Sequence, residues 1–147
     1  MRHRIFLYIV VVGSFLYGLL AVQSVIRTRR QLPQSVAALQ RMPTPAAQRQ
    51  AQYLRSRWYQ GEQLLTLLSG ALFLIGAAGL GLQQSWSRLT LFGAAWVAMA
   101  QTAWALITSF EWFRATGTGM LYQINLLNIA WVLLILAIAP TERLLPR

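Results

Sequence analysis

Residues 27–60, RTRRQLPQSVAALQRMPTPAAQRQAQYLRSRWYQ, form the only long polar segment of the chain. This segment holds seven of the thirteen arginines and lies between one apolar run and three others. Arginines close to apolar runs set the orientation of those runs in a membrane. The segment therefore decides how the rest of the chain is arranged.

The composition is that of a membrane protein. Hydrophobic residues make up 56% of the 147 residues and charged residues only 11%, and the apolar residues come in blocks. A net charge of +10 in a soluble protein would suggest nucleic acid. Here most arginines flank apolar runs, where they suit anionic lipid headgroups, so we expect an anionic bilayer and no nucleic acid as partner. Cysteine is absent, which excludes disulfides and thiolate metal sites.

Four apolar runs are long enough to cross a bilayer. Residues 5–26 carry no charge, and 22 helical residues reach about 33 Å. This run is too long for the apolar core of a signal peptide, so we interpret it as an uncleaved first span. The other predicted spans are residues 64–82, 89–110 and 120–139. The sequence thus predicts an all-α membrane protein, a single domain over residues 1–147 that forms an antiparallel bundle of four transmembrane helices.

An amphipathic, arginine-rich helical connector, residues 27–63, is predicted between the first and second spans. Pro33 suits the first turn of a short helix over residues 32–42, and Pro43 ends it. Thr44 and Pro45 then form an N-cap and a first helical position. Small and apolar residues follow at helical spacing, which indicates one face of a helix: Ala47, Ala51, Leu54, Trp58 and Gly61.

Two courses remain open for residues 44–63. The helix either continues into the second span or bends at Gly61 and lies along the headgroups. With four spans, both termini lie on one side with five arginines, and the other side carries eight. The excess predicts that the connector is cytoplasmic and that both termini lie on the opposite side, in a bacterial inner membrane.

Polar residues inside the last two spans are the first candidates for function. Gln101 lies on a stripe of small residues in the third span with Thr108, and the fourth span carries Asn125 and Asn128. Gln101 and Asn128 lie at similar predicted depths, so their amides are expected to meet. We favour a structural interpretation, in which each interhelical amide contact contributes about 0.6–2 kcal/mol. The alternative is a polar path across the membrane or a pocket for a lipid headgroup.

Glu111 ends the third span, three residues before Arg114. A carboxylate near the hydrocarbon boundary can carry protons or bind a cation. A surface pair with Arg114, worth a few tenths of a kcal/mol, is the simpler interpretation. We expect no metal site, because the chain has one histidine and no cluster of ligands with metal spacing. We expect no cofactor and no catalytic site, because no hydroxyl has a base beside it.

These features favour a non-catalytic integral membrane subunit or assembly factor of a larger membrane complex, partnered by other membrane subunits or by itself. The alternative is a small oligomeric transporter or channel that uses the amide stripe and Glu111. On the first hypothesis the connector contacts anionic lipid or a partner through six arginines: Arg27, Arg29, Arg30, Arg49, Arg55 and Arg57.

Overall fold

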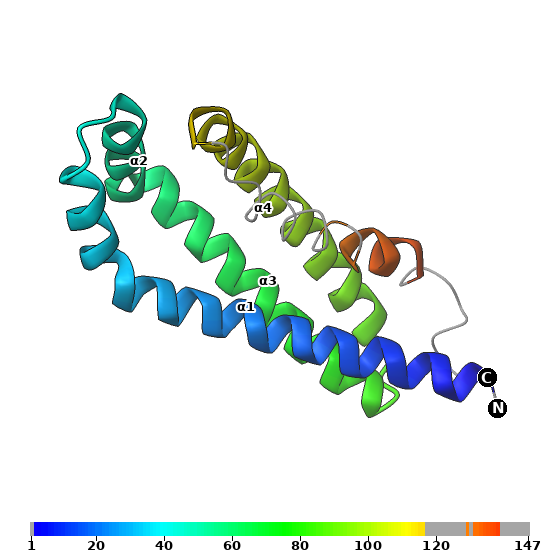
Figure 1. The fold of residues 1–147 in the computed structure, drawn as a ribbon. Helices are drawn as coiled ribbons and strands as arrows, with labels where there is room; N and C mark the ends of the chain where they lie inside the picture. Colours follow the sequence, from blue (N-terminus) through cyan, green and yellow to red (C-terminus); the bar gives the residue numbers. More distant parts are fainter. Residues whose placement is uncertain (1, 117–128, 130, 139–147) are drawn as a thin grey trace.

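The computed structural model describes residues 2–116, 129 and 131–138, with side chains described from residue 4 to residue 107 and in the two later segments. All regular structure in this part of the chain is helical, which confirms the predicted all-α class. Four helices precede the short helical segment 131–138 (Figure 1): α1 Arg2–Gln40, α2 Pro45–Arg55, α3 Arg57–Gly81 and α4 Ser87–Thr116.

Three of these helices contain stretches long and apolar enough to cross a membrane: Arg4–Gln40, Arg57–Gly81 and Ser87–Ile107. They contain the predicted first and second spans almost entirely and most of the third, as expected for an integral membrane protein. The predicted fourth span, residues 120–139, lies mostly outside the described residues. Its described part, 131–138, is helical and packs into the core.

Helix α1 is much longer than one span. Its 39 residues correspond to about 58 Å, nearly twice the thickness of a hydrocarbon core. The prediction of a separate helix over residues 32–42 is wrong, because α1 continues through Pro33 to Gln40. A proline inside a helix leaves the carbonyl four residues earlier without its donor, but this part of α1 is mostly exposed and water can satisfy that group. Figure 1 shows α1 turning toward α2 in its last third.

Helix α2 begins as the sequence predicts. The Thr44 hydroxyl accepts a hydrogen bond from the Ala47 amide (3.4 Å), and Pro45 is the first helical residue. Ala47 and Ala51 are buried, and α2 contacts mainly α1. The predicted apolar face of this helix is therefore confirmed at its first two positions.

The connector breaks at Ser56, not at Gly61. Ser56 is extended (φ −74°, ψ 156°), its hydroxyl donates to the Tyr53 carbonyl (2.6 Å), and the Tyr59 amide donates to that hydroxyl (3.3 Å). One serine thus ends α2 and caps α3, as serine does well. Neither predicted course is correct in detail, because Gly61 lies inside α3 and α2 lies across the end of the α1–α3 pair (Figure 1).

Small residues let α1 and α3 approach closely. A Cβ at Gly18 would lie 2.7 Å from the Gly70 carbonyl oxygen, and a Cβ at Gly70 would lie 3.0 Å from the Cβ of Ala21. Contacts between small residues are a common way for membrane helices to associate. The small size of Gly18 is therefore used in the contact between α1 and α3 of one chain.

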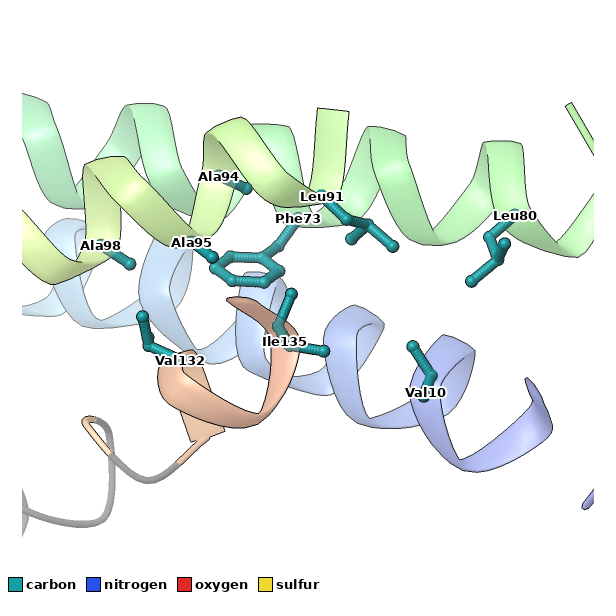
Figure 2. Packing of buried hydrophobic residues seen from close by; sticks show 9 residues of the cluster. All are labelled: Val10, Phe73, Leu80, Leu91, Ala94, Ala95, Ala98, Val132 and Ile135. Carbon is teal, nitrogen blue, oxygen red and sulfur yellow. The ribbon is translucent and has the colours of Figure 1, made fainter. Parts of the chain in front are cut away.

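Helices α3 and α4 form an antiparallel hairpin, as the short turn between them predicts. Leu82 ends α3, and Gln83 turns the chain with a positive φ of 57°. The core lies between α1, α3, α4 and segment 131–138, and Figure 2 shows Phe73 at its centre. Three residues of the predicted small stripe on α4 are buried: Ala94, Ala98 and Ala105.

Two polar groups lie in this apolar core. The Ser14 hydroxyl and the Trp131 indole N–H are buried and have no hydrogen-bond partner among the described residues. The Trp131 ring lies directly against Gly13, where a Cβ would overlap it. Buried polar groups are normally paired, so this part of the core is less stable than its packing alone suggests.

Candidate functional site

A polar cluster joins α2, α3 and α4 at the end of the hairpin farthest from the Gln83 turn. The Tyr53 hydroxyl of α2 donates to Glu62 Oε2 of α3 (2.6 Å). The same hydroxyl accepts a hydrogen bond from Trp104 Nε1 of α4 (3.0 Å). One tyrosine oxygen therefore connects three helices, including residues 51 positions apart.

Gln101 belongs to this cluster. Its side chain hydrogen-bonds to the Glu62 side chain, and the Thr102 hydroxyl approaches its Oε1 at 3.5 Å. Gln101 is half-buried, so its amide is partly shielded from lipid and water. The amide thus joins α4 to α3, which is an interhelical contact with a carboxylate. The predicted contact with Asn128 lies outside the described residues.

Aromatic rings surround the polar cluster. Trp58 and Trp104 are stacked, with ring centroids 5.5 Å apart and planes 24° apart. Tyr53 and Tyr59 meet edge to face at 5.7 Å. Trp58 and Trp104 are both exposed at the surface. Such a group is typical of the membrane–water interface, where an aromatic ring meets lipid and its polar atom meets water or a partner.

The cluster fixes the position of α2. Apart from the cluster, α2 is joined to α3 through Ser56 and the Tyr53–Tyr59 ring contact, and its two buried alanines contribute little apolar area. A hydrogen bond to a charged group stabilises by roughly 1.5–3 kcal/mol. A second, more exposed contact joins the ends of α1 and α2, because Arg55 Nη2 donates to the Gln40 side-chain oxygen (3.4 Å).

Exposed arginines gather around and on α2, on a surface that we call the basic end. We use this name for the last third of α1, the loop after it, α2 and the first residue of α3, which together carry seven exposed arginines: Arg27, Arg29, Arg30, Arg41, Arg49, Arg55 and Arg57. No carboxylate occurs from residue 27 to residue 61. The arginines predicted to contact lipid or a partner all lie on this surface.

The remaining predicted site residues are not placed. The backbone of Thr108 and Glu111 lies in α4, but their side chains lie outside the described part of the structure, as do Asn125 and Asn128. No group of three or more histidine, aspartate or glutamate residues suited to a metal ion occurs among the described residues.

Sequence reasoning missed the importance of Tyr53, Glu62 and Trp104. In the sequence Glu62 lies just before the predicted second span and Trp104 lies inside the predicted third, so neither indicates a site by itself. A partial signal was available, because Glu62 lies 19 residues before the end of α3 and Gln101 lies 14 residues after the start of α4, so both lie far from the turn between the helices. Residues at equal distances from such a turn become neighbours in an antiparallel pair.

Comparison of the chain with protein families, curated proteins and solved structures finds no match.

Proposed function

We propose that the chain is a non-catalytic integral membrane subunit or assembly factor, and that its basic end docks on a partner subunit or on anionic lipid. The observation that supports this most is the combination of exposed charge with a fixed scaffold. Seven arginines are exposed, and the helix at their centre is held on the bundle by the Tyr53 hydrogen bonds. A surface held in place loses less conformational entropy on binding than a mobile segment does.

The expected partner follows from the charge. A surface with seven arginines and no neighbouring carboxylate before Glu62 suits an acidic protein face or anionic headgroups. Exposed charges act within about 10 Å at 0.1 M salt. The attraction should therefore weaken as salt increases.

Co-purification tests the proposal. The full-length chain, tagged and extracted in a mild detergent, is expected to retain a fixed set of membrane proteins, which mass spectrometry identifies. Arg49→Glu should release that set, because it reverses a charge on α2. Arg4→Glu makes the same change near the other end of α1 and should leave the set bound. Equal release by both variants, or a chain that purifies alone, would contradict the docking role.

A second function, transport by an oligomer, is favoured by one observation. Glu62 and Gln101 place a carboxylate and an amide together on neighbouring helices, which is a pairing used in ion pathways. Reconstitution of the purified chain in liposomes tests it. Uptake of protons or sodium that Glu62→Gln abolishes would favour transport, whereas no uptake by the wild-type chain would favour the subunit.

A further inference from the structure

One face of α1 is exposed along its whole length. Between residues 5 and 20 the exposed side chains recur every three or four positions, as expected for one side of a helix. The opposite side is buried at Val10, Ser14 and Gly18 against the rest of the bundle. We call the exposed set the α1 stripe: Ile5, Tyr8, Ile9, Val12, Phe15, Leu16, Leu19 and Leu20.

The stripe ends in a hollow that four polar or charged side chains and one isoleucine line. A hollow of about 290 Å³ lies along the next two turns of the same face and is lined by Gln23, Ile26, Arg27, Arg30 and Gln31. These positions continue the spacing of Leu19 and Leu20, so the stripe and the hollow form one continuous surface. The hollow lies where the uncharged run of α1 ends.

The hollow has the chemistry of an anion site. Guanidinium groups bind phosphate through two parallel hydrogen bonds, and the two amides add neutral donors. No carboxylate lies on α1 from residue 2 to residue 40, so nothing on this helix repels an anion. Exposed Arg29 adds further positive charge nearby, which disfavours a lipid headgroup that carries its own ammonium.

The part of the stripe next to the hollow is long enough to cover one leaflet. Half of a hydrocarbon core is about 15 Å, which corresponds to about ten residues of helix. Counted back from Ile26, ten residues reach Leu16, and Leu19 and Leu20 lie between them on the stripe. We propose that α1 binds one anionic phospholipid lengthwise, with its phosphate in the hollow at Arg27 and Arg30 and an acyl chain along the stripe. This inference rests on the membrane-spanning role of α1 in the proposed function.

A second copy of the chain fits this face less well. A parallel pair joined along the stripe would bring Arg27 and Arg30 of both copies together, and like charges at contact distance repel. A phospholipid supplies an apolar chain and the opposite charge on the same molecule. It therefore satisfies both parts of the surface.

Lipid titration of the purified, delipidated full-length chain, followed by native mass spectrometry, tests the proposal. Dioleoyl phosphatidylglycerol should bind at least tenfold more tightly than dioleoyl phosphatidylcholine. Each arginine near an anionic headgroup contributes roughly fivefold to affinity, so Arg27→Gln with Arg30→Gln should weaken phosphatidylglycerol binding roughly 25-fold. Arg41→Gln with Arg49→Gln removes equal charge from exposed positions outside the hollow and should change it less than threefold.

Any of four outcomes would overturn the site. Equal losses in the two double variants would show general charge attraction. If dihexanoyl phosphatidylglycerol binds as tightly as the dioleoyl lipid, or if inorganic phosphate displaces the lipid, the hollow is an anion site that does not bind an acyl chain. Because the chain has no cysteine, Leu20→Cys can report a second copy. Ile75→Cys is the control, because Ile75 is exposed on α3. If Leu20→Cys forms disulfide dimers faster than this control, a second copy of the chain occupies the stripe.

Failure here is distinct from failure of the proposed function. Lipid titration uses the purified chain alone, whereas docking is scored by the proteins that co-purify with it. Loss of the lipid site with retained partners would leave the subunit role in place.

Discussion

Tyr53→Phe should detach α2 from the bundle without unfolding the spans. The change removes one oxygen and with it two hydrogen bonds, the donation to Glu62 at 2.6 Å and the acceptance from Trp104 at 3.0 Å. The ring remains, so its packing is largely kept. The variant therefore isolates the polar contribution of the cluster to the position of α2.

The two bonds differ in strength. A bond to a carboxylate contributes about 1.5–3 kcal/mol, and a neutral one about 0.5–1.5 kcal/mol. The Glu62 bond is only partly buried and the Trp104 bond is exposed, so we take values near the lower ends and expect a total of about 2–3 kcal/mol. This applies to local opening of α2, since α1, α3 and α4 keep their apolar contacts.

Hydrogen exchange of the full-length chain in detergent measures this opening. Amides of α2 should exchange roughly 30- to 150-fold faster in Tyr53→Phe, while those of α4 change little. Tyr8→Phe is the matched control, because Tyr8 is 68% exposed on α1 and far from α2 in sequence. It should alter α2 exchange less than twofold. Trp104→Phe removes the weaker of the two bonds and shortens the ring stacked on Trp58, but it keeps the bond to Glu62, so it should accelerate α2 exchange less than Tyr53→Phe does. If α2 exchange in Tyr53→Phe stays within threefold of wild type, the buried alanines hold α2 and the cluster does not.

Three further predictions concern the bundle. Gly18→Val should destabilise it by about 1–3 kcal/mol in a denaturant titration, because the new Cβ meets the Gly70 carbonyl, while Gly61→Ala, in open space, should not destabilise it. Ser14→Ala should leave stability unchanged or raise it by up to about 1 kcal/mol in the same titration, because the buried hydroxyl has no partner among the described residues; a clear loss would reveal an interaction outside them. Reporter fusions in the α1–α2 loop and in the α3–α4 turn should report opposite sides of the membrane, and the same side would mean that α3 does not span.

The helices were predictable because their signals are local. An uncharged run of 22 residues, a Thr-Pro cap and a stripe of alanines each depend on residues a few positions apart. The structure agrees at all three, with α1 spanning the run, Thr44 capping α2, and Ala94 and Ala98 buried. The predicted helix start near Pro33 was wrong because a proline is found both in the first turn of a helix and at a bend inside one.

The site was predicted only in part because its contacts are long-range. The depth of Gln101 was counted from the far end of its span, which paired it with the fourth span, whereas counting from the turn places it beside the half of α3 that contains Glu62. The sequence around Tyr53 does not indicate a role in a site, because its hydrogen bonds form only when α2 lies across the end of the bundle. That crossing begins at Ser56, whose hydroxyl bonds to the last turn of α2 and caps α3.

Position and charge can be varied separately at the basic end. Tyr53→Phe changes the position of α2 and leaves every arginine in place, whereas Arg49→Glu changes the charge at an exposed position and leaves the Tyr53 hydroxyl in place. If a partner recognises a fixed surface, both variants should release it, and the Tyr53 variant should still bind anionic vesicles as wild type does. If charge alone matters, only the arginine variant should lose the partner, because a detached α2 carries the same charges. The Tyr53 hydrogen bonds would then serve the stability of the chain and not its recognition.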